Sequence, residues 1–500
     1  MKRSVSIDRT HEIGWISKYL FGSFTEHMGR CVYGGIYEPD HPLADEFGYR
    51  KDVLQLVKDL SVPILRYPGG NFVSGYDWKD GIGSVRTPKL DLAWAQLEPN
   101  TFGLHEFMRW CEKVGSEVLM SVNMGTGSCM DAAQLVEYCN VDGGGKFAEM
   151  RKRNGREKPF NIKRWCLGNE MDGSWQICAM TATEYARKAT ETAKMMKMVD
   201  PSIMLSVCGS SSCDMPTFPE WDRIALEHTY DYVDYLSLHR YYTYTPSGRA
   251  FDFMSCHADL DRYVKSAVAT ADYVKAVKRS SKKIMLSLDE WNVWHTKPMS
   301  QMGRPDYEDS YDVKWKVGIH RLENVYDLTD AVAFAGMACA MINNADRIGM
   351  GCLAQLVNVI APIMTEDGGR CFRQTTYYPY KTMLEYAKGV ALDLNVQTPT
   401  VSSDYGDVGE VYCACAYDNG RYSLFVINKT DKPVSYDINF AVAPVAMKSV
   451  AQLFGTPNAY NDFDAPDRVT MKRENLQTEK LSSFTVVLQP TSFTHFVFEE

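Results

Sequence analysis

The chain has 500 residues, 45% of them hydrophobic, and a formal net charge of −9 at pH 7. That length exceeds the usual size of one hydrophobic core, so we expect one large domain and one small domain. The negative charge, the absence of a basic run interleaved with aromatic residues and the absence of a bilayer-length apolar run argue against nucleic acid and membrane partners.

The N-terminus and the cysteines both indicate a cytoplasmic protein. Lys2 and Arg3 make the first residues basic, but no apolar core follows them, so no signal peptide is predicted. The 14 cysteines are scattered, and neither a CxxC pair nor an HExxH motif occurs. We therefore expect buried, reduced thiols rather than a zinc site, and no metal or other cofactor.

From residue 15 onward a unit repeats, in which a short apolar run ends in polar residues or glycine and a helical segment follows. Residues 2–10, before the repeat, alternate weakly and predict an edge strand. About eight runs occur, which is the strand count of a (β/α)₈ TIM barrel, an α/β fold that carries its chemistry at the carboxyl ends of the strands. We assign the barrel to residues 15–385. The runs end at residues 22–27, 66–71, 123–125, 168–170, 208–210, 237–241, 289–290 and 354–358.

Helical segments and two long connections separate these runs. Residues 51–60 carry apolar side chains at helical spacing, and a capping box from Thr181 to Glu184 opens a long helix. The connections 71–100 and 295–327 are unusually long for a compact domain and are rich in aromatic residues. They are either peripheral additions or the walls of a pocket at the top of the barrel.

The pattern changes at about residue 386, where short strands follow one another without helices. Two alternating segments, 411–417 and 422–427, surround Asn419-Gly420 and predict a β-hairpin. Further strands follow, the last at residues 491–498. Residues 386–500 therefore predict an all-β jelly-roll sandwich, and residues 1–14 are expected to add a strand to it.

Two glutamates stand at the ends of apolar strands. Glu170 follows one such run directly after Asn169, and Glu290 follows another directly after Asp289. A carboxylate placed there needs partners, and each glutamate alone is explained equally well by an ionic contact that caps a strand. Because the pattern occurs twice, with aromatic residues after each glutamate, it favours the paired carboxylates of glycoside hydrolysis.

With these motifs in view, the sequence resembles the α-L-arabinofuranosidases of glycoside hydrolase family 51. The resemblance spans roughly residues 20–380 in order, while the last hundred or so residues resemble the family only in architecture. It rests on seven segments: 21–27 (FGSFTEH), 66–76 (RYPGGNFVSGY), 91–94 (DLAW), 165–173 (WCLGNEMDG), 237–242 (SLHRYY), 289–294 (DEWNVW) and 353–358 (LAQLVN).

The resemblance implies a retaining, exo-acting α-L-arabinofuranosidase that trims arabinan, arabinoxylan or other arabinose-containing oligosaccharides. It implies Glu170 as the general acid/base, Glu290 as the nucleophile, Asn169 as the partner of the sugar 2-hydroxyl and Arg66 as a cation that orients Glu290. The furanose pocket that it implies is formed by Glu26, Asn71, Trp94, His239, Tyr241, Trp294 and Gln355. The family also implies a homo-oligomer, with a hexamer as the first expectation.

Some positions depart from the family's pattern, so the resemblance does not predict what the site binds on its leaving-group side. They are Ser174, Cys178 and Arg240. The connection 295–327 also looks individual, and we expect it to gate that side. Two alternatives remain: a β-glycanase or xylosidase of the same family, and a non-catalytic sugar-binding barrel. Retention of both glutamates argues against the second alternative.

Overall fold

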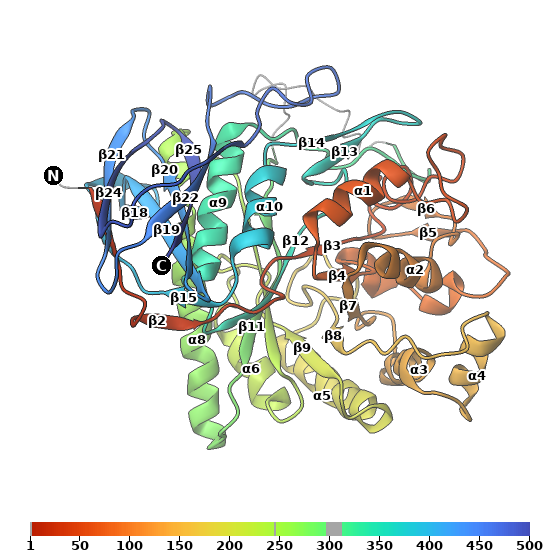
Figure 1. Ribbon diagram of the computed structural model, residues 1–500. Helices are drawn as coiled ribbons and strands as arrows, with labels where there is room; N and C mark the ends of the chain where they lie inside the picture. The colour runs from red at the N-terminus through yellow and green to blue at the C-terminus, as the bar shows by residue number, and fades with distance from the viewer. Residues whose placement is uncertain (1–2, 245–246, 297–312) are drawn as a thin grey trace.

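Eight parallel strands close a barrel in the first four fifths of the chain (Figure 1). The computed structural model describes residues 3–244, 247–296 and 313–500. Pairing of β12 with β3 closes the cylinder, and the predicted fold class is confirmed. The barrel strands are β3 (Gly22–Phe24), β4 (Ile64–Tyr67), β7 (Glu117–Ser121), β8 (Arg164–Leu167), β9 (Met204–Cys208), β10 (Tyr235–Tyr242), β11 (Met285–Val293) and β12 (Ile348–Leu353).

Helices cover the outside of the barrel, and α1 is an example that buries one face. In α1 the buried positions are Val53, Val57 and Leu60, as the helical spacing predicted, and the capping box at Thr181 opens α5. The helices are α1 (Lys51–Leu60), α2 (Leu104–Val114), α3 (Cys129–Asn140), α4 (Lys146–Arg153), α5 (Ala182–Val199), α6 (Glu220–Thr229), α7 (Ala250–Phe253), α8 (His257–Lys278), α9 (Leu328–Ile342) and α10 (Tyr377–Tyr386).

The connection from β4 to α2 has structure of its own at the carboxyl end of the barrel. It contains two short 3₁₀ helices, η1 (Asn71–Gly75) and η2 (Trp78–Gly81), and a two-stranded sheet, β5 (Lys89–Asp91) with β6 (Gln96–Glu98). A second small sheet, β13 (Ile363–Thr365) with β14 (Cys371–Arg373), follows the last barrel strand.

The C-terminal region is an all-β sandwich with an apolar interior. Its smaller sheet has the order β16 (Asn395–Gln397), β1 (Ser4–Ile7), β21 (Val434–Phe440), β24 (Ser483–Leu488). Its larger sheet has the order β2 (Glu12–Trp15), β15 (Val390–Leu392), β19 (Val411–Asp418), β20 (Arg421–Asn428), β25 (Ser492–Glu499), β22 (Ala446–Leu453), β23 (Lys472–Asn475). A separate hairpin joins β17 (Thr400–Ser403) to β18 (Gly406–Gly409).

Two predictions for the sandwich, a hairpin and an N-terminal edge strand, have different outcomes. The predicted hairpin joins β19 to β20 through Asn419 and Gly420, whose positive φ angles of 49° and 83° are those a two-residue turn requires. The expectation of an edge strand at residues 2–10 is wrong, because β1 pairs with β16 on one side and with β21 on the other. The domain boundaries at residues 14 and 385 remain predictions.

Helix α9 lies between the barrel and the sandwich (Figure 1). It packs on β11, α8 and α10 on the barrel side and on β19, β20 and β25 on the sandwich side. All 15 of its residues are buried, and its sequence is apolar around the whole circumference, as a helix enclosed on all sides requires.

The helices and the cysteines were compared with what membrane spans and disulfide bonds require. Within residues 3–244, 247–296 and 313–500, no helix is long and apolar enough to cross a membrane. All 14 cysteines fall in these ranges and are free thiols. Ten are buried, as the sequence predicted, whereas Cys178 is exposed and the remaining three, Cys129, Cys213 and Cys371, are half-buried.

Candidate active site

Glu290 lies on β11 with both carboxylate oxygens held by neighbouring side chains. Arg66, on β4, donates from Nη1 to Oε1 over 2.5 Å, and the Tyr241 hydroxyl donates to Oε2 over 2.6 Å. The guanidinium of Arg66 is buried and stacks on the ring of Phe24, 4.6 Å from its centroid. Glu290 is thereby fixed in position, and its negative charge is stabilised by a cation that cannot deprotonate.

A β-bulge explains how two neighbouring acids of β11 both reach the barrel interior. Between the pairs Ser237–Ser287 and His239–Glu290, β11 advances one residue more than β10. Successive side chains of a regular strand point to opposite faces, and a bulge changes that alternation. Asp289 and Glu290 therefore both contact Arg66. The expectation that the run ends at residue 290 is wrong, because β11 continues to Val293.

Glu170 stands in a tight turn after β8. The turn has positive φ angles at Gly168 (90°) and at Glu170 itself (43°), and a side chain at residue 168 would meet Met124 at 2.8 Å. Glu170 Oε1 lies 2.8 Å from His239 Nδ1, and Oε2 accepts from Trp175 Nε1 over 2.6 Å. A non-glycine residue at positive φ is uncommon in proteins, and strained backbone of this kind clusters at functional sites.

His239 connects the three carboxylates at the centre of the site. Its Nδ1 also lies 3.5 Å from Glu290, and its Nε2 lies 3.4 Å from Asp289. Burial lowers the pKa of His239, but the charge of Glu290 and the hydrogen bonds to Asp289 and Glu170 outweigh burial and raise it to about 10. Burial raises the pKa of Asp289, but Arg66 and His239 lower it to about 2. At neutral pH His239 is therefore an imidazolium and Asp289 a carboxylate.

Glu26, after β3, is held by three donors from three different segments. Oε1 accepts from the Phe72 backbone N–H over 3.0 Å and from Trp94 Nε1 over 2.9 Å, and Oε2 accepts from Gln355 Nε2 over 3.1 Å. Burial and the nearby charge of Glu290 raise the pKa of Glu26 to about 8. This carboxyl is consequently protonated at neutral pH, unlike Asp289.

Three other predicted residues, Asn169, Asn71 and Trp294, have polar atoms with weak hydrogen bonds, or none, within the described part of the chain. Asn169 accepts from Arg66 over 2.6 Å, while its amide nitrogen has only a 3.4 Å contact with Gln176. Among the described residues, no partner hydrogen-bonds to Asn71 Oδ1 or Trp294 Nε1, although both atoms are buried. Buried polar groups are normally hydrogen-bonded, so each of the two is a candidate ligand contact.

These residues surround an open cavity of about 510 Å³ at the carboxyl end of the barrel. Nine of the eleven predicted site residues line it. The other two, Arg66 and His239, lie behind this lining and touch it through Glu290 and Glu170. The predicted residues thus form one constellation that comes from six of the eight barrel strands or the loops that follow them.

Several residues of the cavity wall were missed by the sequence reasoning. They lie mostly on loops, where no periodicity marks them: Phe24, Met28, Gly70, Trp175, Ser211, Ser212, Asp214, Leu322 and Ile360. Trp175 had a usable signal, because it closes the aromatic stretch after Glu170. Arg240, noted as a departure, also lines the wall, and it binds Ser212 over 2.8 Å and Asp259 over 2.6 Å. Of the other two departures, Ser174 and Cys178 are both exposed.

The two long connections meet beside the cavity. The connection 71–100 contributes Asn71 and Trp94 to the lining, and the end of the other connection contributes Leu322. They are joined by backbone hydrogen bonds, from Trp315 N to the Ala95 oxygen and from Leu97 N to the Lys316 oxygen. Residues 297–312 lie outside the described residues, and gating by them stays a prediction.

The chemistry of the central residues does not favour a metal ion. Glu170, His239 and Glu290 each offer an atom within 4.8 Å of the others, which is a spacing that a metal can use. A histidine ligand must be neutral, whereas the pKa of His239 is raised to about 10. Arg66 and Tyr241 already occupy both oxygens of Glu290.

Comparison with known proteins agrees with this geometry. The family model described as "Alpha-L-arabinofuranosidase C-terminal domain" matches residues 289–492, and "Alpha-L-arabinofuranosidase 1 domain" matches residues 56–254. An intracellular exo-α-(1→5)-L-arabinofuranosidase of Acetivibrio thermocellus is 47% identical over 86% of this chain and 85% of its own. An exo-α-(1→6)-L-arabinofuranosidase of Bifidobacterium longum is 41% identical over 98% of this chain and 95% of its own. A solved family 51 α-L-arabinofuranosidase from Bifidobacterium longum superposes with a TM-score of 0.92 at 36% identity, covering all of both chains. The chain belongs to the α-L-arabinofuranosidases of glycoside hydrolase family 51.

Proposed function

We propose that this protein is a retaining, exo-acting α-L-arabinofuranosidase that removes terminal arabinofuranosyl residues from oligosaccharides. The observation that carries the proposal is the pair Glu170 and Glu290, which present carboxylate oxygens within 4.8 Å of each other in the cavity. Retaining glycosidases hold their two carboxyl groups about 5–5.5 Å apart, whereas inverting enzymes leave roughly 6.5–9.5 Å for a water molecule. In this assignment Glu290 is the nucleophile and Glu170 the general acid/base.

Charge balance in the buried cluster supports these roles. Arg66 and protonated His239 contribute two positive charges, and Asp289 and Glu290 contribute two negative charges. The cluster is therefore neutral when Glu170 holds a proton, and neutrality matters because an unpaired buried charge is strongly unfavourable. The proposed mechanism requires that proton on Glu170 when the substrate is bound, because Glu170 must protonate the leaving oxygen.

The same balance holds in the covalent intermediate. In the first step a Glu290 oxygen bonds to the anomeric carbon, the glycosidic bond breaks, and the proton of Glu170 moves to the leaving oxygen. Glu290 is now a neutral ester and Glu170 a carboxylate, so the net charge of the cluster stays at zero. In the second step water attacks the anomeric carbon, gives its proton to Glu170 and releases Glu290.

The proposed substrates are arabinose-containing oligosaccharides such as fragments of arabinan or arabinoxylan. Relatives of similar identity are named for (1→5) and (1→6) linkages, and both linkages are candidates here. We place Asn169 at the sugar 2-hydroxyl, with Glu26, Asn71, Trp94, Tyr241, Trp294 and Gln355 around the furanose. A cytoplasmic location fits the relative that is named intracellular.

The test is hydrolysis of an aryl α-L-arabinofuranoside followed by proton NMR. We expect α-arabinofuranose as the first-formed sugar, and β-arabinofuranose would refute the double displacement. A panel of aryl glycosides separates this activity from that of a β-xylosidase or β-glycanase, and the absence of turnover on all of them would favour a sugar-binding protein. The homo-oligomer remains a proposal that light scattering tests, because a monomer mass would contradict it.

A further inference from the structure

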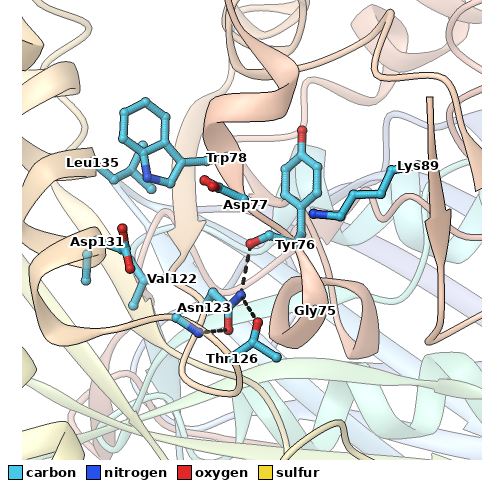
Figure 2. A pocket seen from close by; sticks show the side chains of 12 residues that line it. Gly75, Tyr76, Asp77, Trp78, Lys89, Val122, Asn123, Thr126, Asp131 and Leu135 are labelled. Atoms are coloured by element: carbon cyan, nitrogen blue, oxygen red, sulfur yellow. Dashed lines mark hydrogen bonds between the residues drawn. The ribbon is translucent and has the colours of Figure 1, made fainter. Parts of the chain in front are cut away.

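A second cavity lies at the carboxyl end of the barrel, outside the catalytic cavity. Its volume is about 250 Å³, and it lies between the β4–α2 connection and the segment that follows β7 (Figure 2). Helix η1 separates the two cavities: Asn71 at its start lines the catalytic cavity, and Gly75 at its end lines this one. Two of its lining residues lie in segments that the sequence analysis singled out, Trp78 in the connection 71–100 and Asn123 at a strand end, and the proposed reaction uses neither residue.

The lining combines an apolar floor with a polar rim. Val122, Ala132 and Leu135 form apolar surface together with the indole of Trp78, while Asp77, Lys89, Asn123 and Asp131 supply polar groups (Figure 2). Sites for small organic ligands have this construction, in which apolar surface contacts the ligand body and a few polar groups fix its orientation. Drug-sized ligands occupy roughly 300–1,000 Å³, so this smaller cavity suits a single sugar ring.

One polar atom of the lining lacks a partner. Trp78 Nε1 is buried and without a hydrogen bond to any residue that the structure describes. The rings themselves are held in place, because Trp78 packs against Tyr138 with centroids 5.1 Å apart and Tyr76 against Phe72 at 4.6 Å. Rigid aromatic side chains with an unused donor are suited to a ligand that presents both a hydrophobic face and hydroxyl groups.

The charges at the rim favour a neutral ligand. Lys79 lies between the two lining carboxylates, 2.7 Å from Asp131 and 3.5 Å from Asp77, while Lys89 is paired with Asp80 at 3.0 Å. An anion would meet carboxylates, and a cation would meet carboxylates that lysine already neutralises. Hydroxyl groups can use the remaining lone pairs without displacing either lysine.

We propose that this cavity is an accessory binding site for a neutral sugar ring, either free L-arabinose or one residue of an arabino-oligosaccharide. The choice of sugar rests on the proposed function, whereas the existence of the site does not. Ser74 connects the site to the catalytic residues: its backbone oxygen accepts from Thr126, and its hydroxyl accepts from Gln176, which contacts Asn169.

The test counts sugar sites per chain by calorimetric titration of a Glu290→Gln variant with L-arabinose and, separately, with a linear arabinotriose. We expect two sites per chain. Adding Ala132→Leu places a larger side chain in the cavity and removes one of them, while Met130→Leu, at a half-exposed position on the same helix, keeps both. Two sites with both sugars indicate recognition of a single ring, and a second site with arabinotriose alone assigns the site to oligosaccharides.

A second variant covers the case in which Ala132→Leu disturbs helix α3. Trp78→Phe keeps an aromatic ring but removes the Nε1 donor, so we expect about three- to tenfold weaker binding at the second site. One site with both sugars, or two sites that persist unchanged in both variants, overturns the inference. Turnover of an aryl arabinoside by the unmodified enzyme tests the proposed function separately, because site counting does not depend on turnover.

Discussion

The mouth of the barrel and the interior of the β sandwich are both buried, but they are built from opposite kinds of side chain. In the sandwich the buried side chains are apolar, such as Ile438 and Phe498. At the barrel mouth they are charged, as with Arg66 and Asp289. Apolar burial is favourable in itself, whereas buried charges must be compensated by one another. The sandwich interior therefore supplies stability, and the barrel mouth uses part of it to hold a reactive arrangement.

The largest expected effect is at the barrel mouth. Glu290→Ala removes the proposed nucleophile, and we expect kcat to fall by at least about 10⁴-fold on every substrate, including an aryl α-L-arabinofuranoside. Steady-state kinetics on the purified variant measures it, with circular dichroism as the control for folding. A loss below about a hundredfold in a folded variant would show that another residue forms the covalent bond.

The corresponding change in the sandwich interior affects stability instead of catalysis. Phe498 is fully buried and packs against Phe440 and Phe484. Phe498→Ala leaves a cavity, so we expect the free energy of unfolding to fall by about 3–5 kcal/mol. Denaturant unfolding measures the loss, and kcat of the folded fraction should be unchanged because the site is distant. A strong fall in kcat would contradict the division of roles between the two regions.

Substitution of Glu170 distinguishes acid catalysis from nucleophilic catalysis at the barrel mouth. Glu170→Ala removes the proposed proton donor, and such a donor contributes about 10²–10⁴-fold when the leaving group needs a proton. We expect a far smaller loss on an aryl arabinoside with a good leaving group. Added azide should speed turnover of this variant, because a small anion can enter the space left by the carboxylate. Equal losses on good and poor leaving groups, without azide rescue, would rule out the acid/base role.

The raised pKa of Glu26 predicts that the stability of the protein depends on pH. Its pKa is raised from 4.5 to about 8, so the folded state binds more protons than the unfolded state between these values. The associated stability is complete below pH 4.5 and is lost as pH rises through about 8, at roughly 1.4 kcal/mol per pH unit. Glu26→Gln cannot ionise, so its melting temperature relative to that of the wild type should increase from pH 5 to pH 9. A constant difference across this range would contradict the raised pKa.

The smallest expected effect concerns metal ions. Because Arg66 and protonated His239 already compensate the carboxylates, we expect chelator to leave both kcat and the melting temperature unchanged. Activity that is lost in chelator and restored by one divalent ion would show that the carboxylates bind a metal after all.

The sequence predicted those parts of the site in which a polar residue interrupts an apolar run. Glu170 and Glu290 belong to this class, because a charge next to a buried strand has few explanations. The role of Arg66 was implied by the resemblance to family 51 alone. Asp289 was seen only as the neighbour of Glu290, because a regular strand would direct it away from the barrel interior and the β-bulge is not visible in the residue pattern. Trp175 and Asp214 come from loops, whose paths depend on the packing of the whole domain.

The fold shows the same division. Eight apolar runs with polar ends predicted the barrel, and the Asn419-Gly420 turn predicted the hairpin. The two partners of β1 were missed, because a four-residue strand carries no information about what lies beside it. Pairing between segments hundreds of residues apart is decided by the assembled sandwich.

Helix α9 has a consequence for how this enzyme unfolds and how it can be divided. Since the helix is buried by the barrel on one side and by the sandwich on the other, neither part has a complete surface without its neighbour. A chain cut near residue 386 would expose to water one face of a helix that is apolar beyond its first turn, so we expect it to aggregate. The intact chain should melt in a single transition in calorimetry, as one cooperative unit, although its architecture has two parts. The family model that begins at residue 289 crosses the same junction, and its match runs from the end of β11, which carries Glu290, into the sandwich.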